Sequence, residues 1–561
     1  MKRSFLLRFA IVTSLVTLWA CGGEGPGTPV CGSQDYRGGY VIPGPGEEGY
    51  DASLALLARR YDRQFHVFNA APMGVNVESH VSLDRPDMRT LMTDFLTQDD
   101  SFDFETYSGG VKPMEVTDHY YKVAGLYAGA GIGADAMRYA VLRDQGADCG
   151  EIETARQQLL RALDGLHVAF AITGTPGVVA RGFTRTDISG DGQTTQTTPL
   201  FDDQGNPLPL EKDNGTWRED LSGLYPNYIW EDSCSRDMML GWAFASAVAM
   251  EVMEGDPAID ESYRQRIRED SRAVVHELMK VRESGYDLEF PDADGRTTYH
   301  GYLNENSIER DAYMPGFRNG FYAVMALGIV GAFTYASGDL EAREYLYQDL
   351  IVDRELADIA LEDMLYMNMG SQSNYSNYSM AFMAAFLAMR YIDDPVAREK
   401  IKQCTLVELY DTPGETYQPK GAQMSLYDFI VITALLGESA FGDLPLGEVD
   451  SFAFEDAIAG LKGFMTPPYW DLPVEQCDEA ELESGVCTLE NGTVTTVLNE
   501  GGRKGSTVCT DPVPKAIRRP SNYEWRSNPY NPNGGSDGAY LNPGVDFRVA
   551  YWLGRFLKTS K

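Results

Sequence analysis

Two kinds of helical segment alternate along this chain from about residue 117, and this alternation restricts the possible folds more than any other feature. Segments of the first kind are apolar nearly all round, as expected of helices buried on every side. They start near residues 119, 237, 320, 375, 424 and 545. Segments of the second kind are amphipathic, because apolar residues recur at helical spacing among charged ones. These lie near 51–65 (or 87–97), 151–173, 260–284, 341–369, 396–409 and 452–465.

The alternation predicts an all-α fold in which six buried helices form an inner ring and six amphipathic helices wrap it. Such a closed double ring is an (α/α)6 toroid, with little or no sheet beyond a hairpin near 493–497. An irregular array of helices is the alternative. We expect one toroid domain over residues 51–561, within which 466–544 is a long, loop-rich insertion.

The connections between the helices are unequal in length. Turns from a buried helix to the next amphipathic one are brief, as at 255–259 and 393–395, whereas the returns include 174–236, 285–319 and 466–544. In a closed ring, all returns of one sense emerge at the same end, and long loops in compact domains are usually functional. We therefore expect a site at one mouth of the toroid, above the N-termini of the buried helices.

Two motifs stand at the ends of the first long return. It begins with Thr-Gly-Thr-Pro-Gly-Val-Val-Ala-Arg at 173–181 and ends with Trp-Glu-Asp-Ser-Cys-Ser-Arg-Asp at 230–237. Together with an Arg-Tyr-Ile-Asp-Asp-Pro turn at 390–395 and the terminal stretch 543–555, they resemble bacterial lipoproteins of the six-hairpin glycosidase-like superfamily. The resemblance covers roughly 117–561. It implies the toroid architecture and leaves the reaction open.

Asp232 and Asp237 flank the start of the buried helix near 237, with Arg236 between them. Glycoside cleavage needs such a pair of carboxyl groups, one as general acid and one as base. The field at a helix N-terminus favours a carboxylate, so we assign Asp237 as base and Asp232 as acid. Trp230 offers a flat apolar face of the kind that stacks on sugar rings. A network of salt bridges that ties the loop to the helix is the alternative interpretation.

The loop 285–319 brings a different set of groups to the same mouth. Tyr299 and His300 would move a proton in a polysaccharide lyase, in which Arg or Asn neutralises a uronate carboxylate. The substrate-binding candidates are the polar and aromatic residues expected at the mouth. They are Arg181, Trp230, Arg236, Arg310, Arg318, Asn319, Asn374, Asn377, Tyr378 and Trp525.

The charge of the chain narrows the class of partner. A formal net charge of −36 argues against nucleic acid, which demands basic patches. We expect a carbohydrate-active enzyme that binds an oligo- or polysaccharide, with hydrolysis narrowly favoured over lyase chemistry. A non-catalytic glycan-binding or envelope-scaffold protein is the alternative from another class.

The stretch 187–193 resembles the first half of a calcium-binding loop. Asp187, Ser189, Asp191 and Gln193 place oxygen-bearing side chains at alternate positions. The twelfth position, where a bidentate Glu is expected, is Thr198, so a complete EF-hand is absent. The stretch is either a partial, structural Ca²⁺ site or an ordinary turn rich in Asp and Gly.

Residues 1–21 are typical of a lipoprotein signal peptide. Two basic residues precede an apolar run at 5–20, which is too short and too interrupted for a comfortable spanning helix. Leu18–Cys21 resembles the bacterial lipobox, in which a lipid is attached to the Cys thiol. An ordinary secretory signal with an incidental Cys is the alternative.

The segment after Cys21 indicates where the protein resides. Gly22 rather than Asp favours the outer membrane of the cell envelope, and residues 22–50 would form a flexible tether. We identify no further segment that is long and apolar enough to span a bilayer. Seven other cysteines remain, so at least one thiol stays unpaired, and those at 477, 487 and 509 are expected to include one disulfide.

The lipobox predicts that Cys21→Ala abolishes lipid attachment and stalls processing of the precursor. Metabolic labelling with a radioactive fatty acid measures this directly. Label that persists on the variant would rule the assignment out.

Overall fold

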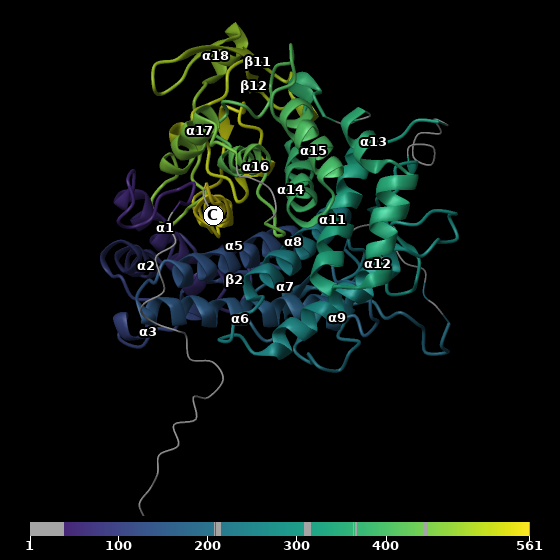
Figure 1. Ribbon diagram of the computed structural model, residues 1–561. Helices are drawn as coiled ribbons and strands as arrows, with labels where there is room; N and C mark the ends of the chain where they lie inside the picture. The colour runs from purple at the N-terminus through teal and green to yellow at the C-terminus, as the bar shows by residue number, and fades with distance from the viewer. Residues whose placement is uncertain are drawn as a thin grey trace, which may run out of the picture.

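The computed structural model describes residues 39–206, 208, 215–307, 316–362, 364, 367–442 and 447–559. The expected lipobox lies outside these residues. Within them, long apolar helices pack side by side in the order in which they occur along the chain (Figure 1), and the last returns to the first. The packing of the helices themselves therefore establishes a closed ring.

Six helices form the inner ring, and each contacts the next. They are α5 (Gly125–Asp144), α8 (Arg236–Met253), α11 (Gly320–Ser337), α14 (Tyr375–Tyr391), α16 (Ser425–Leu436) and α19 (Val545–Phe556). Nearly every residue of α11 is buried, because an inner helix has neighbours on all sides and no polar face to hydrate. The ring closes where α19 packs against α5.

The outer ring consists of amphipathic helices. Its members are α1 (Ala52–Gln64), α6 (Cys149–Ala171), α9 (Glu261–Leu278), α12 (Leu340–Glu344) with η2 (Tyr345–Asp353) and α13 (Leu356–Glu362), α15 (Pro395–Gln403) with η4 (Cys404–Tyr410), and α17 (Ser451–Lys462). Most begin at an Asp whose side chain accepts backbone N–H groups, as Asp260 does for α9. The (α/α)6 toroid is confirmed, and the expected single outer helix at 341–369 is divided into three.

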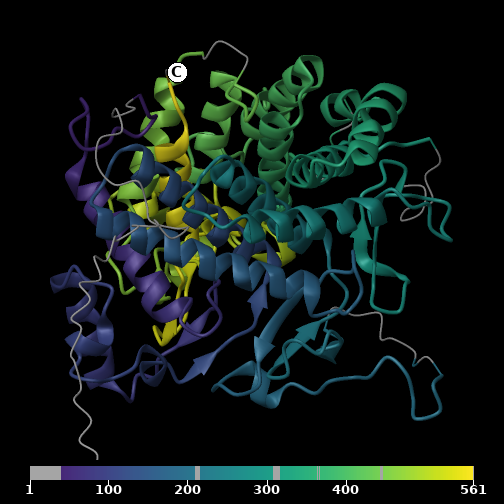
Figure 2. The same cartoon turned by 60° about the horizontal axis from the view of Figure 1, so that its bottom comes forward.

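Short strands precede several of the inner helices along the chain, and Figure 2 shows a group of strands on one side of the helices. The largest sheet pairs β3 (Val123–Ala124), β4 (Gly182–Arg185), β6 (Tyr228–Glu231) and β5 (Trp217–Glu219) in that order. The other sheets contain β1 (Ser79–His80), β2 (His119–Tyr120) and β14 (Tyr540–Leu541), then β7 (Glu289–Pro291) with β8 (Thr297–Tyr302), β9 (Val474–Glu475) with β13 (Asn533–Gly534), and β10 (Val486–Thr488), β11 (Val494–Leu498) and β12 (Val508–Cys509). The hairpin expected near 493–497 is thus part of a three-stranded sheet.

Smaller helices complete the fold. They are η1 (Phe65–Asn69), which continues α1, then α2 (Pro86–Gln98), α3 (Phe104–Tyr107), α4 (Pro113–Val116), α7 (Asp191–Thr194), α18 (Glu479–Ser484) and the short turns η3 (Gly370–Gln372), η5 (Arg503–Gly505), η6 (Lys515–Ile517) and η7 (Glu524–Arg526). The first inner helix starts at residue 125 rather than near 119, because the residues before it pair with β1 and β4.

The structure changes two further expectations: where the packed domain begins, and that no other segment is apolar enough to span a membrane. Tyr40–Ile42 are buried against the end of α19, where the Val41 and Ile42 N–H groups donate to the carbonyls of Leu557 and Gly554. The packed domain therefore begins earlier than residue 51. Among the described helices, Gly320–Ser337 is long and apolar enough to span a membrane by composition, but 89% of it is buried as the inner helix α11.

A glycine contact brings α5 and α8 together. A Cβ atom added at Gly129 would lie 1.9 Å from the carbonyl oxygen of Gly241, and one added at Gly241 would lie 2.2 Å from the carbonyl oxygen of Gly125. No side chain larger than hydrogen fits at these positions, so the two inner helices approach backbone to backbone.

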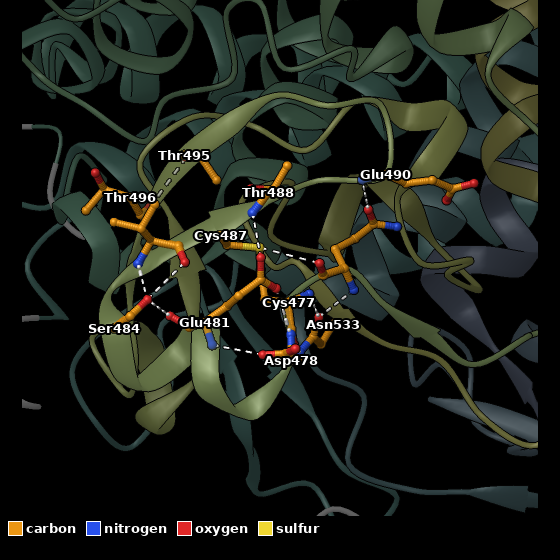
Figure 3. Close-up of a disulfide and its surroundings, with 12 residues drawn as sticks. Cys477, Asp478, Glu481, Ser484, Cys487, Thr488, Glu490, Thr495, Thr496 and Asn533 are labelled. Carbon is orange, nitrogen blue, oxygen red and sulfur yellow. Dashed lines mark hydrogen bonds between the residues drawn. A yellow bond between two sulfur atoms is a disulfide. The ribbon is translucent and has the colours of Figure 1, made fainter.

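The insertion 466–544 is fastened in several ways. Its disulfide joins Cys477 to Cys487, as expected for this stretch (Figure 3), and it lies with the buried thiol of Cys509 in a small separate core. In the same region, Asn533 Oδ1 accepts the N–H of Cys477 at 3.1 Å. The long insertion is therefore a structured part of the domain.

The glycine contact predicts that Gly129→Ala destabilises the domain by about 1–3 kcal/mol, because overpacking must push α5 and α8 apart. Gly131→Ala on the same helix is the matched control. Its added Cβ would lie 3.3 Å from the Phe65 ring, a contact that a shift of a few tenths of an ångström relieves, and alanine has the higher helix propensity. Denaturant unfolding of both variants measures the difference. Equal stability would contradict the proposed close approach.

Candidate active-site cleft

A cleft of about 760 Å³ opens at the mouth predicted from the loop lengths. Its lining includes the residues that begin three inner helices: Ala124 before α5, Asp237 in α8 and Asn374 before α14. The insertion 466–544 supplies most of the opposite wall. Unbonded N–H groups and the helix dipoles at these N-termini favour oxygen-rich or anionic groups in the cleft.

Two of the five acidic residues in the cleft are paired with basic side chains. Glu231 is bound by Lys122, with 2.6 Å between Nζ and Oε2, and by Arg181, with 3.5 Å between Nε and Oε1. The ring Nε2 of His119 lies 2.8 Å from Asp191 Oδ1. These carboxylates are therefore largely engaged within the protein.

The other acidic residues have no basic partner within 4 Å among the described residues. Asp237, in the first turn of α8, accepts a hydrogen bond from Ser235, which in turn accepts one from Arg181 at 2.5 Å. Glu78 accepts hydrogen bonds from the Tyr540 hydroxyl and from Asn522 Nδ2, the latter at 3.1 Å. Both carboxylates are thus oriented by neutral donors or hydroxyls rather than neutralised by a cation.

Asp471 is a partly buried acid that the insertion contributes to the cleft. Burial raises the pKa of this carboxyl, although the nearby Arg519 opposes the shift. Its Oδ1 atom is buried and has no hydrogen-bond partner in the described part of the chain. A carboxyl whose pKa is raised holds its proton more readily, which is the property required of a general acid.

The structure does not bring Asp232 to the cleft with Asp237. Asp232 is 2% exposed and forms an ion pair with Arg218, with 3.0 Å between Oδ2 and Nε. Its Oδ1 accepts the backbone N–H groups of Ser233 and Ala293. Asp232 is therefore part of a salt bridge that holds the loop, as the alternative interpretation proposed. A buried and paired carboxyl does not fit the role of general acid.

The two tryptophans also do not reach the cleft. Trp230 is fully buried in β6, where its Nε1 donates to the Glu219 carbonyl, and Trp525 is 2% exposed. Tyrosines take the aromatic positions instead. The Tyr127 and Tyr523 rings stack in parallel, and the half-buried Tyr121 also lines the cleft. The aromatic side chains of the lining are therefore tyrosines.

The remaining predicted residues divide between the cleft and the protein interior. Arg181 and Asn374 line the cleft with Asp237, whereas Asn319 is a buried cap of α11 and Tyr378 is buried with its hydroxyl donating to Asn368. The other described candidates also lie outside the cleft lining. Asn377 accepts a hydrogen bond from Asn374, and Arg236 packs over the Tyr322 ring. The last two are the half-buried His300 and Arg318. Arg310 and the side chain of Tyr299 lie outside the described residues.

The proposed calcium ligands are engaged elsewhere. Both carboxylate oxygens of Asp187 accept from Arg185, the Ser189 hydroxyl donates to the Asp118 carbonyl, and Asp191 accepts from His119. Gln193 is exposed in α7. The described residues contain no group of three or more His, Cys, Asp or Glu side chains able to hold a metal. Calcium binding stays a prediction, which melting in chelator and in millimolar calcium tests.

Sequence reasoning missed Glu78, Tyr121, Lys122 and Asp471, as well as three arginines at 503, 519 and 526 that line the cleft. They come from the segment before α5 and from the insertion, which carry no recognisable motif. The one available signal was the position of the insertion, a long return loop that must emerge at the mouth.

Comparisons with known proteins give the following findings. No family model matches the chain, and no curated protein matches it. Among solved structures, the cellulase Cel9M of C. cellulolyticum is 10% identical with a TM-score of 0.38, covering 90% of this chain and 98% of that one. A termite endoglucanase from Nasutitermes takasagoensis has the same identity and TM-score, with coverages of 90% and 99%.

A third structure, the α-1,6-mannanase GH76A of Salegentibacter sp. HEL1_6, is 9% identical with a TM-score of 0.28, covering 63% of this chain and 85% of that one. Similarities at this level carry no argument about chemistry. The chain has the six-hairpin (α/α)6 architecture because its own inner and outer helices form that closed double ring.

The buried acid Asp292, close to Asp232 and Asp294, predicts a pH effect on stability. Burial, together with the charges of Asp232 and Asp294, raises the pKa of Asp292 to about 8. An unfolded Asp has a pKa of about 3.9, so the folded state binds the extra proton between these values and loses stability as pH rises through about 8. Asp292→Asn should therefore raise Tm over wild type more at pH 8.5 than at pH 5.

Thermal melts across this pH range check the prediction, with the exposed and distant Asp84→Asn as control. A Tm difference for Asp292→Asn that does not change with pH would contradict it.

Proposed function

We propose that this protein hydrolyses glycosidic bonds of an oligo- or polysaccharide in the cleft at the toroid mouth. The observation that carries the proposal is the presence, in one cleft, of two carboxyl groups in contrasting settings. Asp237 stands at the positive end of α8, and Asp471 has a raised pKa. Acid–base hydrolysis requires such a contrast, because one carboxyl must be ionised while the other is protonated.

Asp237 keeps the role of base, since the N-terminus of α8 stabilises negative charge and Ser235 orients the carboxylate. Asp471 takes the role of general acid in place of Asp232. Glu78, held by Tyr540 and Asn522, would accept hydrogen bonds from sugar hydroxyls. Tyr121 would contribute an aromatic face to the sugar ring.

The second candidate is lyase chemistry, supported by the tyrosines and arginines in the same lining. A lyase would need a tyrosinate or histidine base. Burial and the charges of Asp191 and Glu78 raise the pKa of Tyr121, and burial raises that of Tyr523. Ionising either tyrosine near neutral pH is therefore costly, and hydrolysis is favoured.

The cellular setting belongs to the same proposal. A signal peptide and a lipid on Cys21 would place the enzyme on the cell envelope, at the outer membrane, where it would act on carbohydrate outside the cytoplasm. The sequence at 18–22 supports this location.

The assignment predicts that Asp237→Asn and Asp471→Asn each lower turnover by about 10²- to 10⁴-fold, the usual effect of removing an acid–base group. Reducing-end release from a polysaccharide panel measures hydrolysis, and absorbance of an unsaturated product measures elimination. Glu483→Gln, exposed in the same insertion and outside the lining, is the matched control.

The outcomes separate the candidates. Hydrolysis that survives Asp471→Asn but is lost in Glu78→Gln would transfer the acid role to Glu78. Unsaturated products that persist in Asp237→Asn would replace hydrolysis with elimination. Absence of any turnover by the wild-type protein would leave a glycan-binding protein.

A further inference from the structure

Three arginines of the insertion line the cleft without an acidic partner. Arg503 begins the short turn η5, Arg519 follows η6, and Arg526 ends η7. No carboxylate lies within 4 Å of their guanidinium nitrogens in the described part of the chain. Arg526 makes a long contact of 3.4 Å to the Ser376 hydroxyl and lies 5.4 Å from the centre of the Tyr127 ring.

Unpaired arginines are unexpected in a chain of this charge. The protein carries 83 acidic and 47 basic residues, and most of its other described arginines form ion pairs or donate several hydrogen bonds. Burial lowers the pKa of Arg519, although a guanidinium stays charged at neutral pH. Asp471 lies beyond ion-pair distance and offsets this effect of burial only in part, so an anionic ligand would supply a closer counter-ion.

The opposite wall of the cleft shows the contrast. There Lys122 and Arg181 both bind Glu231, so each of these two cations has an acidic partner within the protein. The free positive charge of the cleft is thus concentrated on the insertion, while the unpaired carboxylates Asp237 and Glu78 come from other segments. A bound chain would meet the three arginines and Asp471 along the insertion, and Asp237 and Glu78 along the other side.

The backbone that carries the arginines is held in place. Close to Arg503, the carbonyl of Gly501 accepts hydrogen bonds from the Ser371 hydroxyl at 2.8 Å and from Gln372 Nε2 at 2.7 Å. Next to Arg519, the side chain of Arg518 is buried and donates to Glu524 and to the Val513 carbonyl. The positions of these cations are therefore built into the fold, which reduces the entropy lost when a ligand binds.

We propose that the cleft selects an anionic saccharide, one that carries carboxylate or sulfate groups, and that Arg503, Arg519 and Arg526 bind these groups. Guanidinium groups match both oxyanions through paired N–H donors. The proposal rests on the proposed function for the location of the substrate, and it specifies the substrate's charge. Neutral glycans would leave the three cations without partners.

Binding is measured separately from cleavage, using the full-length protein with Asp237→Asn in detergent and isothermal titration calorimetry. The probes are hexasaccharides of galacturonate, mannuronate and hyaluronate, each with its methyl-esterified counterpart, and sulfated galactan hexasaccharides with desulfated counterparts. The carboxylate and sulfate arms identify which oxyanion is recognised. Arg503→Gln, Arg519→Gln and Arg526→Gln are added singly to this background.

We expect at least one acidic probe to bind about tenfold or more tightly than its neutral counterpart, with affinity falling as salt rises. Each arginine substitution should weaken it by about 5- to 50-fold, as the loss of a charged hydrogen bond does. Arg272→Gln, an exposed arginine on the outer helix α9, makes the same charge change elsewhere and should have no comparable effect. Arg503 and Arg526 are exposed, so their substitution leaves the core intact, and thermal melts confirm folding.

Equal or tighter binding of the neutral probes would overturn the proposal, as would arginine variants that bind like the control, or no binding of any probe. Failure of the catalytic assignment gives a different pattern. In that case acidic probes bind and depend on the arginines, yet wild-type protein releases no product from them. Cleavage of neutral glycans with no arginine dependence would instead support hydrolysis and refute the charge selection.

Discussion

Closure of the inner ring depends on a buried network of charges that joins its last helix to its first. Arg548 of α19 is fully buried and binds Asp62 of α1, with 2.7 Å between Nε and Oδ1, and Asp135 of α5. Arg138 of α5 also binds Asp62, at 3.2 Å. Burial raises the pKa of Asp135, but His66 and Arg548 outweigh this effect and hold that pKa well below its usual range. A charge left without its partner here would be strongly destabilising. The network therefore keeps α19 fixed to α1 and α5.

That closure determines the geometry of the mouth. Once α19 is fixed beside α5, the insertion that precedes α19 must cross the N-terminal ends of the inner helices. The cleft is therefore assembled from segments separated by hundreds of residues: Glu78, Asp237 and Asp471 reach it from three separate parts of the ring. A close backbone approach at Gly129 and Gly241 keeps two of the helix N-termini adjacent, which stabilises the wall that carries Asp237.

The sequence predicted the ring more completely than the cleft. All-round apolar segments located α8, α11, α14, α16 and α19 to within about one residue, because burial on every side leaves a composition that no loop shares. The sequence pattern placed the start of α5 too early, because strand pairing with distant segments overrides the local pattern there. Asp237, Arg181 and Asn374 were found because they adjoin helix starts or motifs. Asp471 and the arginines were not found, because aperiodic loops acquire their positions only through tertiary contacts. Asp232 was misassigned because its partner Arg218 lies in another strand.

The docking of Tyr40–Ile42 on the C-terminal end of α19 has a consequence for orientation. The cleft lies at the other end of the inner helices, and α19 spans 12 residues, or about 18 Å, between the two faces. Any segment that precedes residue 39 therefore joins the domain on the face turned away from the cleft. If such a segment is fixed to a surface, the cleft opens toward the surrounding medium, where long polymer chains can enter it without first passing between protein and surface.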